Sequence, residues 1–192
     1  MERVLASALA AAMLVAGLPH AARAAKLALV AITTTTGTIV LRLEPGRAPN
    51  TTANFLRYVA AKTYDGTSFY RTVSKRNQPQ APFEVIQGGI NARGRSGNTP
   101  IGLEPTSASG LHNSDGAIAM ARTSDPGSAT TEFFIDLGDA RYLDAGGPLG
   151  AGYAVFGHVV RGMDVVRKIH EAPAQGESLS PPVRILTVRR LP

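Results

Sequence analysis

Short runs of β-branched and apolar residues alternate with polar turn residues along most of the chain. In the segment 38–43, Ile39, Leu41 and Leu43 recur at every second position, which is the period of a strand with one buried face. Applied along the chain, this pattern predicts strands at residues 27–33, 38–43, 68–73, 84–87, 117–121, 132–137, 155–160 and 183–189. The protein is therefore expected to be mainly β.

Only two segments have a helical pattern. Residues 49–62 begin with a proline, which suits a first helical turn, and place Phe55 and Val59 four positions apart. Residues 163–170 place Val165, Val166 and Ile169 on one stripe. Eight strands and two helices predict a closed eight-stranded antiparallel β-barrel capped by two α-helices. A sandwich of two sheets is the competing architecture.

The first 24 residues have the layout of a secretory signal peptide. Arg3 precedes an apolar run at 4–18, and the small-residue triplet Ala22-Arg23-Ala24 follows it. We expect cleavage near Ala24, a single domain over residues 25–192, and a periplasmic or secreted protein. No later stretch reaches the roughly 18 apolar residues of a membrane span, so no stable membrane insertion is expected after cleavage.

Composition narrows the possible chemistry. The 192 residues include no cysteine, which excludes disulfides, thiolate metal sites and cysteine nucleophiles. The four histidines lack metal-ligand spacing, so we expect neither a metal nor another cofactor. A net charge of +6 permits contact with nucleic acid, but the arginine pairs are not interleaved with aromatic residues. Nucleic acid is therefore not an expected partner.

Several short motifs, in a fixed order, resemble those of the cyclophilin family. They are Ser-Phe-Tyr-Arg-Thr-Val at 68–73, Val-Ile-Gln-Gly-Gly at 85–89, Gly-Ala-Ile-Ala-Met-Ala-Arg at 116–122, Ser-Ala-Thr-Thr-Glu-Phe-Phe-Ile at 128–135, Tyr-Leu-Asp at 142–144, Tyr-Ala-Val-Phe-Gly at 153–157 and Gly-Met-Asp-Val-Val at 162–166. The motif Tyr-Ala-Val-Phe-Gly at 153–157 is similar to that of the exported bacterial branch of the family. The resemblance implies a peptidyl-prolyl cis-trans isomerase that acts, as a monomer, on proline-containing peptides and unfolded exported proteins.

The same resemblance assigns expected roles to individual residues. Arg71 matches the family's catalytic arginine, whose guanidinium can donate hydrogen bonds to the amide nitrogen of a twisted X–Pro bond. Phe134 and Leu143 match the apolar walls of the proline pocket, and Gln87 matches the amide that holds the substrate backbone. The full expected set for substrate binding is Gln87, Phe134, Leu143, Ala121, Arg122, Val85, Glu132, Tyr142 and Tyr153.

Some positions depart from the family pattern. Glu84 and Val85 stand where Phe and Met are usual, which predicts a smaller pocket wall that carries a charge. The segment 74–83 is longer than the usual turn. Arg122 and Glu132 replace the usual Asn and Gln, and we expect them to pair across the groove. Glu84 and Val85 favour an alternative, a catalytically weak cyclophilin-like module that binds peptides as a chaperone.

Overall fold

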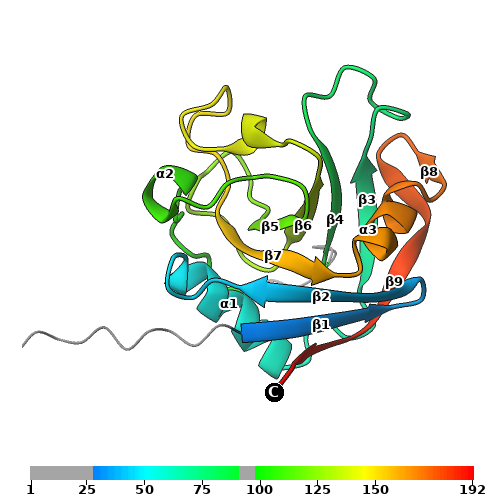
Figure 1. Cartoon of the computed structure of the whole chain (residues 1–192), viewed down its shortest axis with the longest axis horizontal. Coiled ribbons are helices and arrows are strands. Elements are labelled where there is room, and N and C mark those ends of the chain that lie inside the picture. Colours follow the sequence, from blue (N-terminus) through cyan, green and yellow to red (C-terminus); the bar gives the residue numbers. More distant parts are fainter. Residues whose placement is uncertain (1–27, 91–97) are drawn as a thin grey trace, which may run out of the picture.

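A computed structural model describes residues 28–90 and 98–192 of the protein. These residues form a closed antiparallel barrel (Figure 1). Its strands are β1 (Ala28–Thr34), β2 (Gly37–Leu43), β3 (Ser68–Val73), β4 (Glu84–Gly89), β5 (Ala117–Met120), β6 (Phe133–Leu137), β7 (Val155–Arg161) and β9 (Ser178–Arg190), with a short β8 (Ala174–Gln175) beside β9. The order around the barrel is β1-β2-β7-β5-β6-β4-β3-β9, and β9 closes it by pairing with β1. The expected barrel is confirmed and the two-sheet sandwich is excluded.

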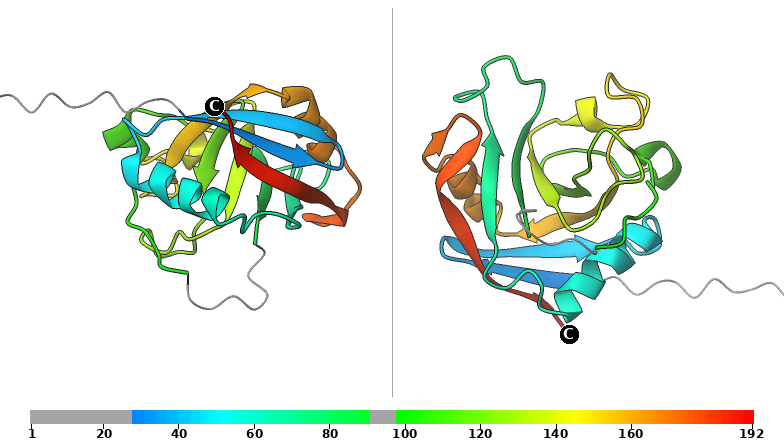
Figure 2. Two further views of the ribbon diagram at one scale, coloured as in Figure 1. Left: turned by 90° about the horizontal axis from the view of Figure 1, so that it is seen from below. Right: turned by 180° about the vertical axis from the view of Figure 1, so that it is seen from behind.

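Both expected helices are present, and they lie on different sides of the barrel (Figures 1 and 2). They are α1 (Pro49–Ala60), which ends two residues before the predicted residue 62, and α3 (Met163–His170). The N-terminus of α1 is capped from a distant loop. The Glu104 carboxylate accepts hydrogen bonds from the backbone N–H groups of Asn50 (3.0 Å) and Thr51 (2.8 Å), and its charge complements the positive end of the helix.

Side chains that point into the barrel form the main hydrophobic core. Phe133 is fully buried there, and its ring centroid lies 5.6 Å from those of Phe55 and Tyr64 and 5.8 Å from that of Phe69. Phe133 is therefore a residue of the barrel core. Because side chains alternate along a strand, the next residue, Phe134, points outward and joins a second, smaller apolar cluster.

Three elements were not expected from the sequence. They are the single-turn helix α2 (Thr106–Ser109), the 3-10 helix η1 (Arg141–Leu143) and the strand β8. In addition, β9 begins at Ser178 and not at residue 183. Pro181 and Pro182 normally argue against a strand, but pairing with β8 and β3 extends β9 across them.

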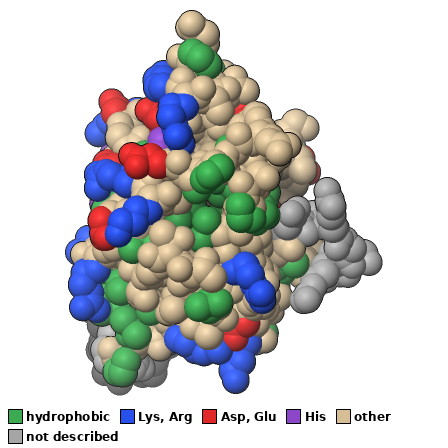
Figure 3. All heavy atoms as spheres, turned by 90° about the vertical axis from the view of Figure 1, so that its right-hand side faces the viewer, with side chains coloured by type: hydrophobic (Ala, Val, Ile, Leu, Met, Phe, Trp, Pro, Cys, Tyr) green, Lys and Arg blue, Asp and Glu red, His purple; other side chains and the backbone are tan. Residues whose placement is uncertain are grey.

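The expected signal peptide, residues 1–24, and the first residue of the first predicted strand, Leu27, lie outside the described residues. Within residues 28–90 and 98–192, no helix is long and apolar enough to cross a membrane. The same part of the chain holds no group of three or more His, Asp or Glu side chains arranged to bind a metal ion. On the face that carries β8 and β9, basic and acidic side chains are interspersed with apolar ones (Figure 3).

Candidate active site

Strand register places the candidate site on the outer face of the barrel. Arg71 on β3 is opposite Gln87 on β4, Gln87 is opposite Phe134 on β6, and Phe134 is opposite Ala119 on β5. These four residues therefore form one row across four adjacent strands. The four residues are far apart in the sequence, but antiparallel strand pairing brings them side by side.

A cavity of about 270 Å³ opens over this row. It is lined by Arg71, Phe83, Val85, Gln87, Ala121, Arg122, Phe134, Leu143 and Tyr153. Eight of the ten residues predicted from the sequence thus line a single cavity. Glu132 and Tyr142 are not in its lining, and Phe83 lines it although the sequence motifs did not predict this. Strand alternation could have indicated Phe83, because it precedes Val85 and Gln87 at the same period of two.

The Arg71 guanidinium is held at two of its nitrogen atoms. Nη1 donates a hydrogen bond to Gln87 Oε1 (2.8 Å), and Nε donates one to the Glu177 carboxylate (2.7 Å). The Arg71 side chain is 34% exposed, so its charge lies at the rim of the cavity. A planar cation fixed in this way can donate hydrogen bonds to an acceptor on a bound molecule.

From Gln87, the partner of Arg71, a chain of hydrogen bonds continues through partly buried side chains. Gln87 Nε2 donates to the Tyr70 hydroxyl (2.8 Å), which donates to Glu132 Oε2 (2.6 Å). Burial and then the hydrogen bond to Glu132 raise the pKa of the Tyr70 phenol, so it stays a donor at neutral pH. Gly89 leaves room for this carboxylate, since a Cβ there would lie 2.5 Å from Glu132 Oε2.

The floor of the cavity is apolar. Phe134 and Leu143 are 5% and 2% exposed, and both belong to the outer apolar cluster together with Val85. The Tyr153 ring meets Phe134 edge to face at a centroid distance of 5.3 Å. Such a surface can hold a small apolar ring out of water.

The expected pairing of Arg122 with Glu132 is wrong. The Arg122 guanidinium lies 4.7 Å above the Tyr153 ring centroid and donates to the carbonyl oxygens of Gly152 and Thr123. Glu132 instead accepts the Tyr70 hydroxyl. Arg122 gains a cation–π contact and backbone acceptors without leaving the cavity rim, so the two side chains have separate partners.

Glu84 also differs from expectation, because it does not line the cavity. Its carboxylate accepts a hydrogen bond from the backbone N–H of Lys75 (3.2 Å) and lies 3.3 Å from His170 Nε2. Glu84 follows Phe83 and precedes Val85, so alternation along β4 turns it to the opposite side. Tyr142, outside the lining, stacks on Phe83 at a centroid distance of 6.1 Å.

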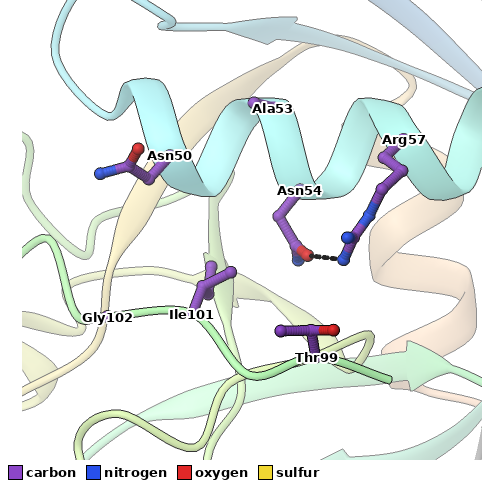
Figure 4. Close-up of a pocket in the computed structure, with 7 residues that line it drawn as sticks. All are labelled: Asn50, Ala53, Asn54, Arg57, Thr99, Ile101 and Gly102. Atoms are coloured by element: carbon purple, nitrogen blue, oxygen red, sulfur yellow. Dashed lines mark hydrogen bonds between the residues drawn. The ribbon is translucent and has the colours of Figure 1, made fainter. Parts of the chain in front are cut away.

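A second hollow, of about 400 Å³, lies between α1 and the segment 99–102 (Figure 4). Asn54 and Arg57 point from α1 toward Thr99. Arg57 donates to Asn54 Oδ1 (2.8 Å), and the Asn54 amide donates to the carbonyl of Thr130 (2.6 Å). The Asn54 and Arg57 side chains of this hollow are thus already hydrogen-bonded within the protein. None of the site residues predicted from the sequence lines the hollow.

Comparisons with known proteins agree with this geometry. The family model described as cyclophilin type peptidyl-prolyl cis-trans isomerase matches residues 29–190. A peptidyl-prolyl cis-trans isomerase of Acinetobacter baylyi is 38% identical over 186 residues and 93% of each chain. Peptidyl-prolyl cis-trans isomerase A of Dickeya dadantii is 39% identical over 155 residues, 79% of this chain and 75% of the relative.

Solved structures show the same fold. A cyclophilin type peptidyl-prolyl cis-trans isomerase of Cryptosporidium parvum, crystallised in the presence of the dipeptide Ala-Pro, has a TM-score of 0.71 and 21% identity, with 85% of this chain and 99% of that one covered. The family model matches residues 29–190, and the Acinetobacter baylyi relative is 38% identical to this chain. The chain therefore belongs to the cyclophilin-type peptidyl-prolyl cis-trans isomerases.

Proposed function

We propose that this protein isomerises X–Pro bonds of unfolded exported proteins, with Arg71 as the catalytic residue. The observation that carries the proposal is the position of the Arg71 guanidinium, which lines the same cavity as Phe134 and Leu143 and is tied to Gln87. The relatives named as peptidyl-prolyl cis-trans isomerases support the reaction type.

Rotation about an X–Pro bond is slow because amide resonance sets a barrier of about 20 kcal/mol. In the twisted state the proline nitrogen regains its lone pair and can accept a hydrogen bond. Arg71 donates to that nitrogen, and it gains little from the planar amide. An interaction made mainly in the transition state lowers the barrier directly, and no covalent intermediate is needed.

The other lining residues bind the peptide around that bond. Phe134 and Leu143 take the pyrrolidine ring into the apolar floor, which keeps water away from the reacting amide. Gln87 orients Arg71 and binds the substrate backbone. Ala121 and Arg122 follow the end of β5 at the cavity rim, where main-chain groups can pair with an extended peptide of any sequence.

The alternative of a binding module without catalysis loses one of its two supports. It rested on Glu84 and Val85, and Glu84 turns away from the cavity while Phe83 adds an aromatic ring to the lining. Val85 remains a smaller wall than the methionine usual in the family. We therefore keep the enzyme as the proposed function.

Export is part of the proposal and rests on the sequence of residues 1–24. Expression of the full chain in a bacterial host, followed by fractionation and mass spectrometry, tests it. We expect a mature protein that begins near Ala25 in the periplasmic fraction. An intact chain with Met1 in the cytosol would contradict export and leave the isomerase proposal standing.

A protease-coupled assay on a short X–Pro peptide tests the catalytic role. Arg71→Ala should lower kcat/KM by roughly 100- to 1000-fold, the range for losing a key donor to a transition state. Arg161→Ala, which removes an exposed arginine of β7, is the matched control and should behave as wild type. An Arg71→Ala variant that folds and keeps its rate would refute the role of Arg71.

A further inference from the structure

The β8–β9 hairpin brings an acidic side chain to the candidate active site. Gln175 pairs with Ser178, so Gly176 and Glu177 form the two-residue turn between the strands. Gly176 has a φ of +57°, which a hairpin turn of this length requires. From this turn the Glu177 carboxylate accepts the hydrogen bond of Arg71 Nε at 2.7 Å.

The backbone of the turn is fixed against β3. The carbonyl of Glu177 accepts a hydrogen bond from Thr72 N–H (2.9 Å), and Ser178 is opposite Arg71 in the strand register. The Asn77 amide donates both to the carbonyl of Gly176 (2.9 Å) and to that of Thr72 (2.8 Å). The long connection between β3 and β4 therefore ties the turn in place through Asn77.

Glu177 and Gln87 together define the orientation of the guanidinium. Glu177 accepts a hydrogen bond from Nε and Gln87 accepts one from Nη1. Because the guanidinium is planar and rigid, two hydrogen bonds at different nitrogens fix its orientation. Nη2 donates no hydrogen bond to the residues in 28–90 and 98–192. The fixed geometry leaves this nitrogen available to a bound substrate.

The ion pair contributes little to stability. The two side chains are 34% and 32% exposed, and ion pairs of this kind are usually weak. Its main effect is on orientation, since a guanidinium held only by Gln87 could rotate about that contact. We propose that Glu177 is a positioning residue of the isomerase, which holds Arg71 in the orientation that the twisted amide requires. This inference rests on the proposed function.

The test compares Glu177→Ala and Glu177→Gln with wild type in the protease-coupled assay. We expect Glu177→Ala to lower kcat roughly tenfold, the effect of losing one charge-assisted hydrogen bond, with KM changed less than twofold. Glu177→Gln keeps an acceptor oxygen, so its kcat should lie between those of wild type and Glu177→Ala. Glu171→Ala, which removes an exposed acid just after α3, is the charge-matched control and should match wild type.

Two further readouts separate positioning from a merely structural role. In NMR spectra, hydrogen exchange of the Arg71 Nε–H should accelerate in Glu177→Ala, while the melting temperature stays within about 2 °C of wild type. In an Arg71→Ala background, Glu177→Ala should cause no additional loss of activity, because it acts through Arg71.

The outcomes distinguish the two proposals. If the wild type is inactive, the proposed function fails. If the wild type and Arg71→Ala are both fully active, the catalytic role of Arg71 fails, and the role of Glu177 fails with it. If wild type is active and Arg71→Ala is not, but Glu177→Ala keeps or exceeds the wild-type kcat, only the role of Glu177 is overturned. An equal loss of activity in both Arg71 backgrounds would also overturn it, since Glu177 would then act independently of Arg71.

Discussion

A carboxyl group buried in β6 should make the stability of this protein fall as pH rises. Asp136 has no exposed surface, and neither of its carboxylate oxygens has a hydrogen-bond partner among the described residues. Burial, reinforced by the negative charges of Asp144 and Asp115, raises the pKa of Asp136 well above its usual value of 3.8. The perturbation that tests this is Asp136→Asn, which keeps the shape of the side chain and removes its ability to ionise.

The direction and size of the change in stability follow from the difference between the pKa of Asp136 in the unfolded chain and its raised pKa in the native protein. Below pH 3.8 the carboxyl is protonated in both states, and its contribution to stability is fully present. Above that pH the unfolded chain releases the proton while the native protein keeps it, so the free energy of unfolding falls by about 1.4 kcal/mol per pH unit. The loss continues until the pH passes the raised native pKa. For a domain of this size it corresponds to roughly 3–6 °C in Tm per pH unit.

The assay is calorimetric melting of wild type and Asp136→Asn from pH 3 to pH 8. The difference in Tm should be smallest at the acid end and grow in favour of Asp136→Asn as the pH rises. Asp164→Asn, which changes a carboxylate that is 72% exposed, should show no such growth. A pH-independent difference between wild type and Asp136→Asn would refute the argument.

Two other substitutions test features of the fold and the site. Glu104→Ala should lower the free energy of unfolding by about 1 kcal/mol, because it removes the acceptor at the N-terminus of α1. Denaturant unfolding of wild type, Glu104→Ala and Glu104→Gln, which keeps one acceptor oxygen, measures this difference. Equal stability of all three proteins would contradict it. Tyr70→Phe should lower kcat/KM about fivefold in the protease-coupled assay, since it removes the hydroxyl that accepts a hydrogen bond from Gln87 and donates one to Glu132. An unchanged rate would show that Gln87 is held without Tyr70.

The barrel could be predicted because its strands carry a local signal. Alternation such as that of Ile39, Leu41 and Leu43 depends only on neighbouring residues, and all three are fully buried. The start of β9 could not be predicted, because Pro181 and Pro182 are locally unfavourable in a strand and only pairing with distant strands keeps them there.

The candidate site was predictable where a motif carried it and not elsewhere. Arg71, Gln87 and Phe134 lie in recognisable strand motifs, and the register aligns them in one row. Glu177 is 106 residues from Arg71 in sequence, and a lone glutamate in a turn gives no sign that it will meet a guanidinium. The same limit applies to the burial of Asp136, which depends on the packing around β6.

Closure of the barrel by β1 and β9 has a consequence for synthesis. The first strand leaves the ribosome long before its partner, so β1 keeps an open hydrogen-bonding edge until the last strand emerges. The hairpin that begins this last strand also carries Glu177. A growing chain therefore lacks both the β1–β9 pairing and the contact between Glu177 and Arg71 until β9 has been synthesised.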